Sequence, residues 1–226
     1  MTKIIRAEFY KLGKSIAPWG IMLGYFLLCS ILVKDRYDLV GYFKASLYPI
    51  PFLLFMHTAL AIFMIGNEFD RRLIQGYVAS GNRRINIFLG TLIAYLTVSL
   101  VMTVATLLIH SLMGLVKCGE AIPWRTILLL LPSFLGVSLF PAFLAFVFKD
   151  IGRTLGTGLI SYIIMVFSLN TAPLSDKAVY LPYGHPLLVF ADIVPGNITS
   201  LLLIDAVWIT VLAAGSYMAF SRSDLK

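Results

Sequence analysis

Six apolar runs, each near the length that crosses a lipid bilayer, dominate this 226-residue chain. A transmembrane helix needs about 20 consecutive apolar residues, because the hydrocarbon core of a bilayer is about 30 Å thick. The runs occupy residues 16–33, 47–66, 85–116, 127–148, 155–169 and 198–220, and the fifth is short and glycine-rich at its start. They predict an all-α integral membrane protein with six transmembrane helices.

Composition supports a lipid environment and excludes several other classes. Only 13% of the residues are charged, against about 25% in an average soluble domain. The net charge of +7 is spread over the ends of the apolar runs and does not form the single basic patch typical of nucleic-acid binding. Cys29 and Cys118 show no disulfide or metal-ligand spacing. No interval between runs could hold a soluble domain, so residues 1–226 are predicted to form one transmembrane domain.

The distribution of lysine and arginine predicts the orientation of the chain. With the N-terminus in the cytoplasm, twelve of the 18 basic residues lie inside: Lys3, Arg6, Lys11, Lys14, Arg71, Arg72, Arg83, Arg84, Lys149, Arg153, Arg222 and Lys226. The other six lie outside: Lys34, Arg36, Lys44, Lys117, Arg125 and Lys177. Cytoplasmic loops of membrane proteins carry an excess of such residues. We therefore expect both termini to be cytoplasmic.

The first fifteen residues have the pattern of an amphipathic helix. One face carries an apolar stripe, made by Ile5, Phe9, Leu12 and Ile16. The other side carries basic residues, namely Lys3, Arg6, Lys11 and Lys14. A helix of this kind lies in the inner membrane interface, with its basic face towards anionic headgroups. The alternative is a positively charged N-terminus that only fixes the topology.

A charged segment, "NEFDRRLIQGYVASGNRRINIF", separates the second and third apolar runs. Residues 68–80 are predicted to form a cytosolic helix with Phe69, Leu73 and Tyr77 on one face, ended by Gly81. A connection between neighbouring helices needs only about two to eight residues, whereas the segment 67–84 is much longer. It is either a docking element for a partner or a solvated loop whose arginines only set the topology.

Four features together resemble the membrane subunits of type-2 ABC transporters over the whole chain. They are "AEFYKL" in the N-terminal helix, the six runs, "GYVASGNRR" in the charged segment and the tail "FSRSDLK". The resemblance implies a coupling helix in residues 67–84 that is seated in a separate ATPase subunit. It assigns this contact to Glu68, Arg71, Arg72, Tyr77, Arg83 and Arg84, and it places the next cytosolic loop, with Lys149 and Arg153, near the same ATPase.

The resemblance also implies re-entrant helices on the outer side of the membrane, between the fifth and sixth spans. Residues 170–197 there are apolar in "PLLVFADIV" and are interrupted by Pro173, Pro182, Pro186 and Pro195. Such a segment is too broken to span the bilayer and too apolar for an ordinary exposed loop. Irregular backbone is acceptable at membrane depth when it is buried against protein. An ordered outer loop is the alternative.

The sequence contains none of the nucleotide or hydrolase motifs that we sought. There is no GxxxxGK[ST] motif, so ATP would be bound by a partner subunit, and no cofactor or metal is expected in this chain. HExxH, GxSxG and a Cys/His dyad are also absent. The "EFDRR" stretch is similar to a motif of intramembrane CAAX-type proteases, but Glu68 has no adjacent glutamate and falls in the loop. We therefore expect no enzyme.

Three ionisable residues inside the spans are candidates for the substrate path, because such residues are costly in lipid. They are His57, His110 and Asp205. The alternatives are that both histidines are neutral packing residues and that Asp205 lies near the outer headgroups.

The function that the resemblance implies is a permease subunit of a bacterial inner-membrane ABC exporter. The resemblance implies a path built between two permease subunits, either identical or paralogous. The scarcity of charge in the spans favours a hydrophobic or amphipathic substrate, such as an antimicrobial or other peptide, or a drug. The alternative is a secondary transporter or a non-transporting membrane immunity protein, neither of which needs an ATPase.

Overall fold

The computed structural model describes residues 2–170, 178–193 and 198–222. Within these ranges every regular element is a helix. The long ones are α2 (Ile16–Lys34), α8 (Arg84–Cys118), α9 (Trp124–Phe148), α10 (Ile151–Asn170) and α13 (Ile198–Ser221). One further long segment consists of α5 (Ile50–Ala61), the π-helix η1 (Ile62–Gly66) and α6 (Asn67–Asp70). The predicted all-α fold is confirmed.

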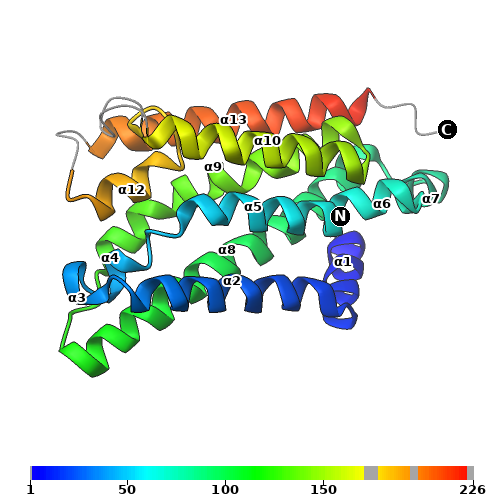
Figure 1. Ribbon diagram of the computed structural model, residues 1–226. Coiled ribbons are helices and arrows are strands. Elements are labelled where there is room, and N and C mark those ends of the chain that lie inside the picture. Colours follow the sequence, from blue (N-terminus) through cyan, green and yellow to red (C-terminus); the bar gives the residue numbers. More distant parts are fainter. Residues whose placement is uncertain (1, 171–177, 194–197, 223–226) are drawn as a thin grey trace.

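The long helices run side by side between two ends of the molecule (Figure 1). One end carries α1 (Thr2–Lys14), α6, α7 (Leu73–Ala79) and the last turn of α13, and we call it the α7 end. The other carries α3 (Tyr37–Val40), α4 (Tyr42–Ala45) and α12 (Gly184–Phe190), and we call it the α4 end. Helix α9 is central, since it packs on α13, α8, α10 and α5.

Five helical segments in the described part of the chain are long and apolar enough to cross a membrane. They are Ile16–Lys34, Ile50–Asp70, Arg84–Cys118, Trp124–Phe148 and Ile198–Ser221. The fifth predicted span falls in α10, whose described apolar portion, Ile151–Phe167, is shorter. Several spanning helices are thus present, and a count of six remains a prediction. Of residues 170–197, two stretches lie outside the described residues, so the re-entrant form also remains a prediction.

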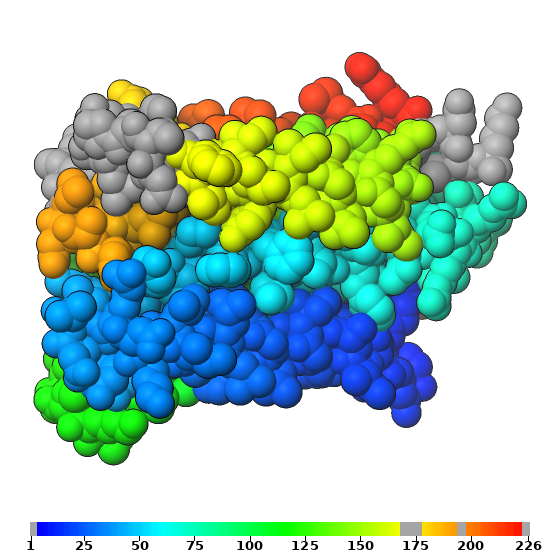
Figure 2. All heavy atoms as spheres, in the orientation of Figure 1, coloured from blue at the N-terminus to red at the C-terminus, as the bar shows by residue number. Residues whose placement is uncertain are grey.

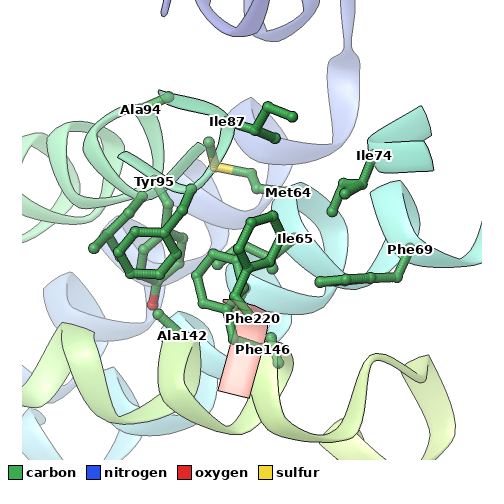
Figure 3. Packing of buried hydrophobic residues seen from close by; sticks show 14 of the residues in the cluster. Met64, Ile65, Phe69, Ile74, Ile87, Ala94, Tyr95, Ala142, Phe146 and Phe220 are labelled. Atoms are coloured by element: carbon green, nitrogen blue, oxygen red, sulfur yellow. The ribbon is translucent and has the colours of Figure 1, made fainter. Parts of the chain in front are cut away.

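An aromatic cluster holds the α7 end together (Figure 3). Phe69 of α6 and Phe220 of α13 both contact Phe146 of α9, with ring centroids 6.2 and 5.8 Å apart. Phe88 of α8 lies 5.0 Å from Phe146. All four rings are buried, and aromatic pairs at such distances add about 0.5–1.5 kcal/mol beyond area burial. The cluster therefore anchors the start of the charged segment to three long helices.

Helix α1 turns one apolar face to the protein and another outwards. Ile4 and Leu12 are buried, and Ile4 packs against Gly90 of α8, where a Cβ would lie 2.7 Å from its Cγ2. Phe9 and Ile16, which belong to the predicted apolar stripe, are exposed. Figure 1 shows α1 lying across the ends of the long helices. The structure gives α1 a protein contact, while its seat in the membrane interface remains a prediction.

The single helix predicted over residues 68–80 is wrong. The chain instead forms α6 and α7, separated by Arg71 and by Arg72, which adopts a left-handed backbone at φ 56°. This bend allows Phe69 and Ile74 to be buried on either side of two exposed arginines. Gly81 has a φ of 83°, as expected of a C-terminal cap.

Gly158 of α10 lies close against Thr58 of α5. A Cβ at this position would lie 2.3 Å from Cγ2 of Thr58. We expect Gly158→Val to lower the thermal midpoint in mild detergent, because overpacking costs about 1–3 kcal/mol. Gly156→Val is the matched control, since nothing lies within 4 Å of its Cβ position. Equal midpoints for the two variants would contradict this packing.

Candidate functional site

The charged segment forms an exposed surface at the α7 end. In Figure 2, residues 67–84 project beyond the neighbouring α2 and α10. Arg71, Arg72 and Arg83 are exposed, and we call these three residues the arginine surface. Arg84 is partly buried, and its Nη1 donates to the carbonyl of Ser221 at 2.6 Å, which ties α8 to the end of α13. An exposed cationic surface on a firmly anchored base is suited to docking a protein partner.

Glu68 lies in the interior, although the sequence analysis placed it with the exposed charges. It is 4% exposed and forms an ion pair with Lys11 of α1. Thr91 of α8 donates to its Oε2 at 3.3 Å. Lys11 also pairs with Glu8 at 2.7 Å, and the hydroxyl of Tyr77 donates to Glu8 at 3.3 Å. Glu68 therefore links α6 to α1 and α8, and it is not part of the arginine surface.

The neighbouring carboxylates stabilise the protonated form of Lys11 and thereby raise its pKa. Burial alone would lower that pKa, but the attraction of Glu68, together with hydrogen bonds to Glu68 and Glu8, raises it above its ordinary value. Lys11 is consequently charged at any physiological pH.

Sequence reasoning missed Glu8. Glu8 lies four residues from both Ile4 and Leu12, on the face that α1 turns to the protein. This spacing could have indicated that Glu8 is buried with them.

The second predicted loop lies at the same end of the molecule. Lys149 ends α9 with a φ of 53°, and Asp150 accepts a hydrogen bond from the backbone N–H of Arg153 at 2.7 Å. Ile151 packs near Gly66, where a Cβ would lie 3.5 Å from its Cγ1. Arg153 is exposed. The structure thus brings Lys149 and Arg153 to the end where η1 meets α6.

His57 belongs to a polar cluster in the centre of the bundle. Its Nδ1 lies 3.3 Å from Oγ of Ser138, and its Nε2 lies 3.4 Å from Oγ1 of Thr103. The Tyr95 hydroxyl donates towards the carbonyl oxygens of His57 and Ser138, at 3.2 and 2.9 Å. These contacts join α5, α8 and α9, which is what a packing residue does. They do not test a substrate role.

His110 joins α8 to α2 near the α4 end. Its Nε2 lies 3.1 Å from Oγ of Ser30, and its ring stacks on Phe26 at 5.6 Å. The imidazole is 1% exposed. A packing role accounts for these contacts, and a substrate role stays a prediction.

Asp205 has two polar partners that sequence reasoning missed, Ser133 and His185. The Ser133 hydroxyl donates to Oδ2 of Asp205 at 2.6 Å, and Nδ1 of His185 lies 3.1 Å from Oδ1. Nε2 of His185 lies 2.9 Å from the carbonyl oxygen of Val179. In a hydrolytic triad the serine and the carboxylate contact opposite nitrogens of the histidine. Here both contact Nδ1, so the arrangement is not that of a serine hydrolase.

Comparison with known proteins identifies the family. The family model of ABC-2 family transporter proteins matches residues 33–220. The match includes both charged loops of the α7 end and all the long helices except the first, α2. A comparison with curated proteins finds no match. The chain belongs to the ABC-2 family of transporter proteins and is a membrane permease of an ABC transporter.

Proposed function

We propose that the chain is the permease half of an ATP-driven exporter and that a separate ATPase subunit docks on its α7 end. The observation that carries this proposal is the construction of the segment 67–84. The arginine surface is exposed, while the same segment is held in the bundle by Phe69, Ile74 and Glu68. A force applied to the arginines therefore reaches the long helices directly.

The transmission route runs along α6, η1 and α5. Helix α6 continues without a break into the π-helix Ile62–Gly66, which extends α5. Single π-helical turns are frequent at functional sites, because they disturb the regular hydrogen-bond ladder. Lys11 connects the same segment to α1, and Phe69 connects it to α9 and α13. Closure of two ATPase subunits would thus tilt several helices together.

The translocation path, in this proposal, forms between two permease subunits. Exposed apolar side chains cover α2 and α10, where Leu23, Leu27, Ile31, Ile160 and Ile164 are examples. Such faces contact either lipid or a second copy. The substrate is hydrophobic or amphipathic, with peptides as the first candidates. ATP is bound by the partner alone.

Affinity purification of the C-terminally tagged chain in mild detergent tests the docking proposal. We expect an ABC ATPase to be recovered with it in near-equal amount, as identified by mass spectrometry. Stable purification of the chain without any ATPase would contradict the proposal and would favour a secondary transporter or an immunity protein.

The orientation can be tested with the native cysteine at the α4 end. Cys118 is exposed, while Cys29 is buried. If the α7 end is cytoplasmic, a membrane-impermeant maleimide should label Cys118 in intact cells. In a Cys118→Ser, Ser80→Cys variant, the new cysteine lies at the exposed α7 end and should react only after permeabilisation. The opposite pattern would reverse the proposed orientation.

A further inference from the structure

A cavity of about 400 Å³ lies at the α4 end, between α4, α9, α12 and the first half of α13. Apolar side chains form much of its wall: Leu129, Leu130, Leu188, Val189, Leu201 and Leu202. Ligand pockets in proteins have volumes of about 300–1,000 Å³ and carry a few polar groups in a mostly apolar lining. The polar groups that line this one inside the bundle are those of Ser133, His185 and Asp205.

Asp205 presents one carboxylate oxygen that lacks a donor. The residue is 1% exposed, and its Oδ2 is satisfied by Ser133. Its Oδ1 forms no hydrogen bond, although Nδ1 of His185 is 3.1 Å away and would pair with it if the imidazole were protonated. A buried oxygen without a donor costs about 1–3 kcal/mol, and more when it is charged. An N–H group of a ligand in the cavity would remove that cost.

His185 cannot supply the missing hydrogen bond from its other nitrogen. Its Nε2 faces the carbonyl oxygen of Val179 at 2.9 Å, and a carbonyl only accepts, so Nε2 carries a proton directed away from Asp205. In its neutral form the histidine therefore orients the site without completing it.

Among the carboxylate, lysine and arginine side chains that line the cavity, Asp205 is the buried one, and the others lie at the rim. Lys44 is neutralised by Asp192, with Nζ 2.5 and 2.7 Å from the two carboxylate oxygens. Arg125 is exposed to solvent at the rim. Asp205 is the carboxylate that remains inside, beside an apolar wall.

We propose that this cavity binds the ammonium end of an amphipathic primary amine. The ammonium group donates to Oδ1 of Asp205, and the hydrocarbon part lies against the leucines of α9, α12 and α13. This inference deepens the proposed export function, on which it rests, by assigning the substrate class and its binding site. A lysine-rich or free N-terminal segment of an apolar peptide has the required chemistry.

Binding of tritiated octylamine to the purified chain in lipid nanodiscs tests the inference, with empty nanodiscs subtracted. Octylamine is cationic at neutral pH. We expect saturable binding that octanoate and octanol do not displace. Asp205→Asn should weaken binding at least tenfold, whereas Asp38→Asn, at an exposed carboxylate of the same end, should leave it unchanged.

A second variant keeps the test informative if Asp205→Asn fails to fold. Leu201→Trp fills the cavity but leaves the carboxylate in place, and it should also abolish saturable binding. Binding at wild-type strength by Leu201→Trp, or by a folded Asp205→Asn protein, would overturn the inference, as would displacement by octanoate. The assay needs no ATPase, so its outcome is separate from that of the co-purification experiment.

Discussion

Replacing Arg71, Arg72 and Arg83 together by alanine is expected to reduce the amount of ATPase recovered with the chain at least tenfold. A tenfold loss corresponds to about 1.4 kcal/mol of binding free energy, and arginine is among the residues enriched at the energetic centres of protein interfaces. The three side chains are exposed and lie outside the buried cluster of Lys11 and Glu68. The variant should therefore insert and fold normally, as gel filtration in detergent would show.

The matched control for this variant removes exposed basic charges from the other end of the molecule. Lys34 and Lys117 are exposed near the α4 end. Their joint replacement by alanine should leave ATPase recovery unchanged. Equal losses in the two variants would mean that net charge matters and that the arginine surface has no special role.

Replacing Lys11 by methionine is expected to lower the thermal midpoint, with a loss of about 1–3 kcal/mol in the free energy of unfolding. Removing one partner of a fully buried ion pair costs about 3–5 kcal/mol, and the value is smaller here because the Lys11 side chain is 37% exposed and partly screened. The substitution leaves Glu8 and Glu68 close together without a cation. Midpoints can be measured by the loss of the monodisperse peak after heating in detergent.

A double variant separates the ion pair from simple packing. Lys11→Met combined with Glu68→Gln removes one of the two unbalanced charges, leaving that of Glu8, and should recover part of the lost stability. If Glu68→Gln lowers the stability of Lys11→Met by as much as it lowers that of the wild type, the two residues are not coupled.

The pH dependence of this effect has a definite sign. The pKa of Lys11 is raised in the folded protein, so its stabilising contribution is fully present below the unfolded pKa of about 10.4 and is lost as pH rises through the folded value. The difference in stability between wild type and Lys11→Met should therefore be smaller at strong alkalinity, where Lys11 loses its proton, than at neutral pH. A difference that grows as Lys11 loses its proton at strong alkalinity would contradict the ion pair.

The fold class and the exposed arginines follow from local patterns, and the structure agrees with them. Apolar runs of bilayer length predict long helices, and a charged segment between two such runs can only lie at an end of the bundle. The bend at Arg72 does not follow from local pattern, because a left-handed arginine is imposed by the need to bury Phe69 and Ile74 on either side of it. The helix propensity of residues 68–80 pointed to a single helix, and tertiary packing overrode it.

The polar clusters were the least accessible to sequence reasoning. Glu68 was grouped with the exposed charges, because nothing near it in the sequence shows that Lys11 would cover it. The partners of Asp205 cannot be found from local pattern, since Ser133 and His185 lie on other helices and far away along the chain. Contacts between separate helices leave no periodic signal. The candidate site at the α7 end could therefore be located from sequence, but its buried half could not.

Site-specific photo-crosslinking tests most directly whether the α7 end is the docking site of an ATPase. A benzophenone amino acid would replace Leu73, which is 41% exposed on α7, and in a control Leu39, which is 81% exposed on α3 at the α4 end. The account predicts a covalent adduct with an ABC ATPase from position 73 and none from position 39. An ATPase adduct from position 39 alone, or none from position 73 in a complex that contains the ATPase, would contradict it.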